Sequence, residues 1–186
     1  RGYLKAAANV LEAHLEDYPT HFVALKIAHS LRFMSGQPAE MLALTRRLLP
    51  HWTAADAAYG FVLGCHAFGL EEMGYFTEAE AYGRNAYRHE QSDAWGLHAV
   101  SHVMEMSSRT DEGIAWLESS RADWSSCNNF AFHIGWHLAL FHLERGDALP
   151  GRRQLEDIVA VVVRRDGLDP LRRELREVGL RHHAAA

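Results

Sequence analysis

The sequence predicts an all-α protein built as a stack of antiparallel helix pairs. Alanine, leucine, glutamate and arginine dominate most segments, and these residues favour helix. Apolar residues recur at spacings of three and four, the period of one helix face, and no convincing strand alternation is found. Connections are short, which makes neighbouring helices antiparallel. The expected helices span residues 2–17, 20–34, 38–49, 54–73, 77–89, 93–107, 111–119, 126–145, 151–165 and 169–180.

Proline marks the boundaries of the first helices. Pro19 follows the first helix, Pro38 opens the third, and Pro50 ends it, because proline lacks the N–H that a helix interior needs. Thr53 and Asp56 stand three residues apart before the fourth helix. This spacing predicts a capping box, in which each side chain satisfies a free backbone N–H.

The later helices begin near residues that commonly cap helices. Thr77 with Glu80 predicts a second capping box, and Asp93 is expected to cap the sixth helix. Asn128 and Asn129 stand where the eighth helix begins, so one of them is expected to act as its cap.

An internal repeat refines the expected fold. The segment Met73 to Ala86 can be laid over Ser107 to Ser120 at an offset of 34 residues, with Glu78 falling on Glu112. A helix–turn–helix unit with this period is typical of the tetratricopeptide repeat (TPR). Because one helix pair cannot bury its own apolar face, stacked pairs build a continuous core with a concave inner wall. The pattern therefore predicts a TPR-like superhelical stack, an α-solenoid.

We expect the TPR-like repeats to occupy residues 1–147. Residues 148–186 are expected to form a divergent C-terminal helical cap followed by a disordered tail. The chain starts at Arg1 without a methionine, which suggests a fragment or a trimmed sequence.

Composition excludes several classes of protein. With 24 acidic and 19 basic residues the formal net charge is −5, which disfavours a nucleic-acid partner. Two cysteines, Cys65 and Cys127, stand far apart, so a reducing, cytoplasmic location is expected. The apolar run Ile158 to Val163 is too short to span a membrane, and no signal-peptide pattern opens the sequence.

Histidines mark the candidate functional site. His98 and His102 are one helical turn apart, and Glu105 returns to the same face. His133 and His137 repeat the spacing on a later helix. These helices belong to consecutive repeats, so we expect them to be neighbours whose side chains converge. By resemblance to groove-binding TPR proteins, the five residues take positions that face the concave groove.

Three chemical interpretations of this cluster stay open. Imidazoles four residues apart can bind one metal ion, here zinc, iron or manganese, with a position left for water. The histidines can instead be neutral, hydrogen-bonded residues that hold adjacent helices together. A third interpretation is a polar groove that grips a carboxylate or a peptide through imidazolium donors.

Three further residues are candidates for the same groove. Phe68 is expected on the inner wall, where an apolar patch beside polar groups is typical of a small-molecule site. Glu71 faces the groove by register and could join the site from the other side. Asn129 lies four residues before His133 and could point into the groove mouth.

The central segments resemble a known family. FGLEEMGYFTEAEAYGRNAY, DAWGLHAVSHVMEM and EGIAWLESSRADWSSCNNFAFHIGWHLALFHLERGD are together similar to the tetratricopeptide repeat protein 38 family. The resemblance covers residues 1–147 and is tightest over 66–147. It implies an all-helical repeat protein whose biochemical activity is poorly defined.

The sequence therefore predicts a TPR-like binding module whose concave groove holds a small molecule, a peptide or a metal ion. The alternative is a metal-dependent enzyme that uses the same residues, with Glu105 as a ligand or general base. No GxSxG, glycine-rich phosphate loop or HExxH motif is present to decide the matter. A second alternative is a structural homo-oligomer in which edge helices pair across a twofold axis, with Ile158 to Val163 as the contact.

Overall fold

The structure is a computed structural model that describes residues 2–127 and 130–165, without the side chains of 148 and 158–165. The expected helix 169–180, the C-terminal tail and the candidate Asn129 lie outside the described residues. The side chains of Ile158 to Val163 also lie outside them, so the predicted oligomer contact stays a prediction.

Every regular element in the described ranges is a helix, which confirms the all-α class. In chain order they are α1 (Gly2–Asp17), α2 (Phe22–Met34), α3 (Pro38–Leu48), the 3-10 turn η1 (Leu49–His51), α4 (Tyr59–Glu72), α5 (Phe76–His89), α6 (Ala94–Met106), α7 (Thr110–Ser119), α8 (Arg121–Trp124), α9 (Phe130–Glu144) and α10 (Ala148–Arg165).

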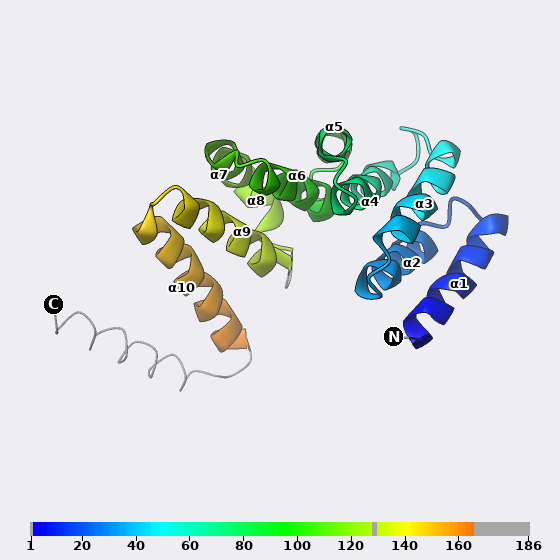
Figure 1. Cartoon of the computed structure of the whole chain (residues 1–186), viewed down its shortest axis with the longest axis horizontal. Coiled ribbons are helices and arrows are strands. Elements are labelled where there is room, and N and C mark those ends of the chain that lie inside the picture. Colours follow the sequence, from blue (N-terminus) through cyan, green and yellow to red (C-terminus); the bar gives the residue numbers. More distant parts are fainter. Residues whose placement is uncertain (1, 128–129, 166–186) are drawn as a thin grey trace.

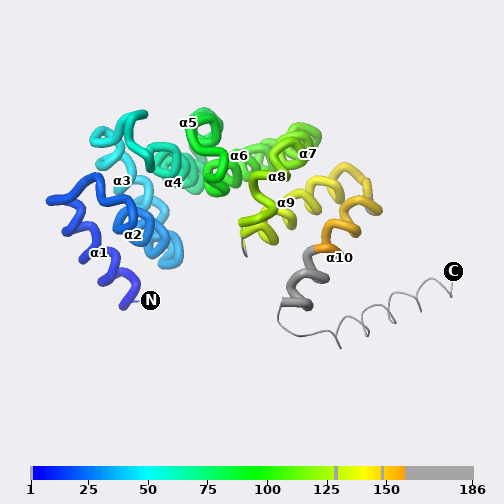
Figure 2. The backbone as a smooth tube through the Cα atoms, turned by 180° about the vertical axis from the view of Figure 1, so that it is seen from behind, coloured from blue at the N-terminus to red at the C-terminus, as the bar shows by residue number. Residues whose placement is uncertain are grey.

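The helices pack mostly against their neighbours in the chain. Figures 1 and 2 show α4 to α7 in the middle of an open arc, with α1 to α3 at one end and α9 and α10 at the other. No repeat is identified among the residues that the structure describes, so the TPR-like solenoid stays a prediction. Within the described part of the chain, no helix has both the length and the apolar character needed to cross a membrane.

The fourth helix begins later than expected. Thr53 donates from both its backbone N–H and its hydroxyl to Asp56 Oδ2, at 2.7 and 2.8 Å. These bonds close a turn, and α4 starts only at Tyr59. The predicted capping box is therefore wrong as a helix start, because its residues satisfy one another within a loop that precedes the helix.

Of the two caps predicted for α5 and α6, the first is wrong and the second is confirmed. Helix α5 begins at Phe76, so Thr77 lies inside the first turn, and the N-cap residue Tyr75 makes no side-chain capping bond. Glu80 instead accepts hydrogen bonds from arginines, at 2.8 Å from Arg84. Asp93 does cap α6: its carboxylate accepts from the backbone N–H groups two and three residues later.

Glycines let α4 approach α6 closely. A Cβ on Gly64 of α4 would lie 1.8 Å from Asp93 Oδ2 and 3.0 Å from the Gly96 backbone N, and a Cβ on Gly96 of α6 would lie 3.4 Å from the Gly64 Cα. The Asp93 cap thus sits against α4, where a larger residue would push the helices apart. This close approach brings the C-terminal turn of α4 alongside the histidine-bearing face of α6.

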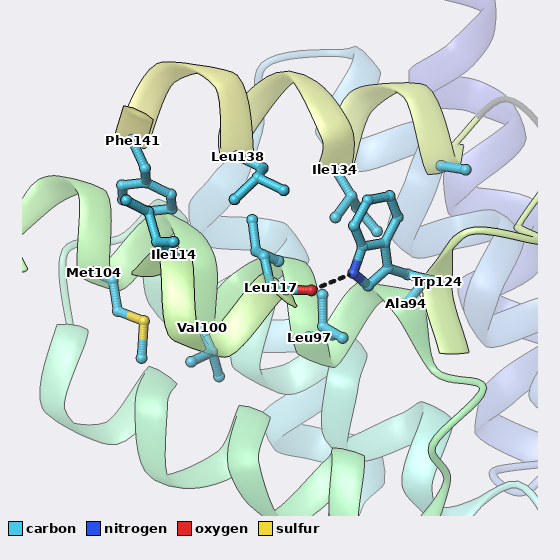
Figure 3. Close-up of a cluster of buried hydrophobic side chains, with 11 residues drawn as sticks. Ala94, Leu97, Val100, Met104, Ile114, Leu117, Trp124, Ile134, Leu138 and Phe141 are labelled. Carbon is cyan, nitrogen blue, oxygen red and sulfur yellow. Dashed lines mark hydrogen bonds between the residues drawn. The ribbon is translucent and has the colours of Figure 1, made fainter. Parts of the chain in front are cut away.

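A hydrophobic core joins α6, α7 and α9 (Figure 3). Its buried members are Ala94, Leu97, Val100, Met104, Ile114, Leu117, Trp124, Ala131, Ile134, Leu138 and Phe141. The Trp124 indole N–H donates to the Leu117 carbonyl oxygen at 2.8 Å and anchors the short α8 to α7. Leu97 and Ile134 each stand next in sequence to a histidine, so burying them in this core turns the histidines toward a different, shared side.

Candidate metal centre

Two neighbouring helices bring four imidazole rings into contact. His98 and His102 lie one turn apart on α6, with ring centroids separated by 4.2 Å. His133 and His137 repeat this on α9, at 4.6 Å. Across the two helices, the His98 ring lies 4.7 Å from the His133 ring, and the rings of His102 and His137 lie 4.6 Å apart. We call these four residues the four-histidine cluster.

The ring nitrogens converge on one small volume. One potential ligand atom from each ring lies within 4.8 Å of those from the other three. The His133 Nε2 is 2.8 Å from the His98 Nε2 and 3.2 Å from the His137 Nε2. Tetrahedral zinc with Zn–N bonds of about 2.0–2.1 Å separates its nitrogens by about 3.3 Å. The 4.8 Å limit exceeds this spacing, so the nitrogens that lie furthest apart would have to approach one another to share one ion.

Carboxylates stand behind two of the rings. The Nδ1 atom of His137 lies 2.8 Å from Glu105 Oε2, and that of His102 lies 3.4 Å from Glu71 Oε1. In both rings the carboxylate faces Nδ1, which leaves Nε2 for the shared centre. Carboxylates commonly support metal-bound histidines in this way, since they fix the tautomer and orient the ring.

The proton positions that these contacts allow leave lone pairs of ring nitrogens facing one another at the centre of the cluster. An ionised carboxylate only accepts, so a neutral His137 ring would carry its proton on Nδ1 and present a lone pair at Nε2. A neutral His102 ring with its proton on Nδ1 would be arranged in the same way, and its buried Nε2 has no hydrogen-bond partner. A neutral ring has one N–H, so His133 Nε2 can donate to only one of its two neighbours, His98 Nε2 and His137 Nε2. If His133 Nε2 carries no proton, its lone pair faces that of His137 Nε2. A cation bound by these nitrogens removes the conflict.

Burial and mutual repulsion disfavour protons on two of the four rings. Burial, followed by repulsion from the other histidines, holds the pKa of His98 well below its usual range. Burial and the neighbouring imidazoles also lower the pKa of His133 to about 4. Burial opposes the charged form of His102, but Glu71 together with Glu105 and Glu72 outweighs it, so the pKa of His102 is raised. A hydrogen bond from imidazole lowers the pKa of Glu105. The neutral form is thus favoured for His98 and His133, and carboxylates stand behind the rings of His102 and His137.

Aromatic side chains surround the cluster. Phe68 is 1% exposed and lies with its ring centroid 5.7 Å from that of His98, while the Phe130 ring lies 5.1 Å from His98 on another side. Trp136 stacks on His133 at 5.9 Å and is 44% exposed. His133 is partly exposed itself.

The structure brings together the residues predicted on α6 and α9 and adds detail to their roles. Glu105 contacts the back of His137 and is not among the four converging ligand groups. Phe68 and Glu71, both predicted for the groove, lie in the wall of the cluster; Glu71 is 7% exposed. Asn129, also predicted, lies outside the described residues.

Two other buried histidines are bonded elsewhere. The Nε2–H of His29 donates to the Cys65 carbonyl oxygen at 2.9 Å, and His66 Nδ1 lies 2.9 Å from the Thr45 hydroxyl. Burial lowers the pKa of His29 to about 3 and that of His66 to about 4. Both are neutral core residues at pH 7.

Sequence reasoning missed the contacts of Phe130 and Trp136. They lie three residues before and three residues after His133, spacings that share one face of a helix. This periodicity was the signal available for placing both of them beside the cluster.

No family model and no solved structure matches this chain. The resemblance to the tetratricopeptide repeat protein 38 family accordingly stays a prediction. What the chain does must be inferred from the four-histidine cluster itself.

Proposed function

We propose that the four-histidine cluster binds a divalent transition metal ion, and that the chain is a TPR-like binding module with this ion on its concave wall. The observation that carries the proposal is the meeting of three Nε2 atoms, at 2.8 and 3.2 Å, with carboxylates behind two of the rings. Lone pairs that face one another at these distances are stabilised by a shared cation.

The donor set narrows the choice of ion. Imidazole nitrogens suit zinc, copper, nickel and iron, whereas calcium and magnesium prefer oxygen ligands. Manganese also favours carboxylate and water ligands. Among the ions expected from the sequence, zinc and iron therefore fit the four nitrogens better than manganese does.

Elemental analysis of protein purified without a histidine tag tests the proposal. We expect about one equivalent of a transition metal per chain, as for a mononuclear site, either as purified or after incubation with Zn²⁺ or Fe²⁺. His102→Ala combined with His137→Ala should abolish stoichiometric binding while circular dichroism shows unchanged helicity.

The matched control is His66→Ala, which removes a buried imidazole that lies outside the cluster. It should retain the metal. Failure of the wild-type protein to bind either ion, or equal binding by the double variant, would overturn the proposed function.

An organic ligand on the same wall is part of this proposal. Phe33 is 42% exposed, and its ring packs edge-on against Phe68 at 5.1 Å, so the apolar wall extends from the cluster to the surface. A small molecule or peptide with a metal-binding group at one end and an apolar body suits this arrangement.

The second candidate is a metal-dependent enzyme, favoured by the partial exposure of His133 beside Trp136. A catalytic ion keeps a coordination position for water, whereas a structural ion is fully ligated. Co²⁺ in place of the native metal discriminates between them through its visible spectrum. A change on adding azide indicates an open position and favours the enzyme; an unchanged tetrahedral spectrum favours the binding module.

A further inference from the structure

We propose that Glu71 and Glu105 make the four-histidine cluster selective for divalent over monovalent ions. This inference rests on the proposed function, because it concerns the same metal site. In this inference the two carboxylates have two roles: they orient the rings, and they determine which ion charge the site prefers.

Charge counting gives the reason. Imidazoles bind metal in their neutral form, so the four ligands contribute no charge. The carboxylates of Glu71 and Glu105 contribute two negative charges within hydrogen-bond reach of the ligand rings, at 3.4 and 2.8 Å. A divalent ion makes the set of four imidazoles and two carboxylates neutral, whereas a monovalent ion leaves it with a net charge of about −1. An uncompensated charge is costly where the surroundings are desolvated.

The surroundings are desolvated around most of the group. The exposed fractions of His98 and His137 are each 3%, and Phe68 and Phe130 pack against the rings. Two other charged residues act on the cluster from further out, Lys26 on His98 and Glu72 on His102. They have opposite signs, and in the described part of the chain neither forms a hydrogen bond or ion pair with a cluster ring, whereas Glu71 and Glu105 each contact one.

The two carboxylates differ in how strongly solvent screens them. The Glu71 side chain is 7% exposed and its Oε2 is buried without a partner, whereas the Glu105 side chain is 32% exposed. Water weakens the field of a charge that it reaches. Glu71 should therefore contribute more to charge selectivity, and Glu105, with its shorter contact to Nδ1, more to ring orientation.

Copper is the probe that isolates charge, because Cu²⁺ and Cu⁺ can occupy the same ligands and differ by one unit. The midpoint potential of the bound Cu²⁺/Cu⁺ pair measures the ratio of the two affinities. Glu71→Gln and Glu105→Gln keep an oxygen that accepts from Nδ1–H but remove the charge. All proteins, including the reference, carry Cys127→Ser, so that this partly exposed thiol does not compete for Cu⁺.

We expect each Gln variant to raise the midpoint potential, Glu71→Gln more than Glu105→Gln. A tenfold change in the affinity ratio corresponds to about 59 mV for one electron, and we expect Glu71→Gln to reach at least about this size. Asp93→Asn, measured at pH 8 where the buried Asp93 carboxyl is ionised, is the control, because it removes a charge in the same region that makes no contact with the cluster rings. Its potential should stay close to the reference value.

Two results would overturn the inference, and they are distinguishable. If the Gln variants bind copper and keep the reference potential while their Zn²⁺ affinity falls, the carboxylates only orient the rings, and the proposed metal site stands. If the reference protein binds neither zinc nor copper, the proposed function fails and this inference fails with it.

Discussion

His102 and His137 each divide their two ring nitrogens between a carboxylate and the shared centre. This division distinguishes an imidazole that could bind a metal from one that only fills a core. His29 and His66 donate one N–H to a carbonyl or hydroxyl oxygen, and neither meets another imidazole nitrogen. A histidine that serves packing needs one hydrogen-bond partner, whereas the cluster concentrates four rings where protons cannot satisfy every contact.

Asp93 allows a prediction about pH at the same scale. Burial raises its pKa to about 7, although two backbone N–H groups favour its charged form. An acid whose pKa rises on folding holds more protons in the folded state, so stability falls as pH rises from about 4 to about 7. Asp93→Asn removes this slope and keeps the cap, because asparagine caps helices as well as aspartate does.

Urea denaturation of both proteins at pH 5 and pH 8 checks this expectation. Relative to the wild-type protein, the variant should gain free energy of unfolding between pH 5 and pH 8. Comparing the two proteins cancels the opposite trend from His29 and His66, whose lowered pKa values cost stability as pH falls. A difference that is independent of pH, or that shrinks toward pH 8, would show that Asp93 is ionised in the fold at pH 5.

At the scale of elements, close helix contacts depend on missing side chains. A Cβ on Gly83 of α5 would lie 2.6 Å from Val100 Cγ2 and 2.9 Å from the Gly96 carbonyl oxygen. The valine can rotate, but the backbone oxygen moves only with its helix. Gly83→Ala should therefore force α5 away from α6 and lower the free energy of unfolding by about 1–3 kcal/mol, as for other overpacked sites.

The control is Gly2→Ala, which also lies in a helix but has no atom within 4 Å of the new Cβ. There we expect no loss, because alanine favours helix more than glycine does. Chemical denaturation of the two variants measures the contrast. Equal stabilities would mean that α5 and α6 do not pack as closely as this structure shows.

Element boundaries mark where sequence reasoning succeeded and where it failed. Apolar periodicity placed α6 and α9 within a few residues, and Asp93 was recognised as a cap because its side chain acts locally. Thr53 and Asp56 match the same local pattern but close a loop, since capping spacing alone does not say whether a helix follows at once. The four-residue α8 was missed because it is too short to show a period.

The site could be predicted only as far as helical spacing reaches. The pairs on α6 and α9 follow from i and i+4 positions, which place side chains on one face. The contact between Glu71 and His102 depends on how α4 packs against α6. The two helices approach closely at Gly64 and Gly96. No spacing within one helix reports which rings will receive a carboxylate.

At the scale of the whole molecule, the four-histidine cluster joins parts that are far apart in the chain. Residues 98 and 102 belong to the central helices, whereas 133 and 137 belong to α9, which continues into α10 at one end of the arc (Figure 1). A bound ion therefore attaches the C-terminal helices to the centre. The helices α1 to α3 lie at the opposite end and contribute no ligand.

Metal binding should consequently stabilise the molecule unevenly. An ion that binds only the folded state at one hundred times its dissociation constant adds about 2.7 kcal/mol, which for a chain of this size corresponds to about 5–10 °C in Tm. Removing the ion with a chelator should lower Tm by that amount. In hydrogen exchange, amides of α9 and α10 should lose protection, while amides of α2 and α3 should keep theirs.

The double variant His102→Ala with His137→Ala provides the control, because it lacks two ligands and should not respond to chelator or added Zn²⁺. If chelation lowered Tm equally in both proteins, the effect would not come from the cluster. If protection fell uniformly from α1 to α10, the ion would stabilise the fold as one cooperative unit instead of fastening α9 to α6. Only a loss of protection centred on α9 agrees with an ion held between these two helices.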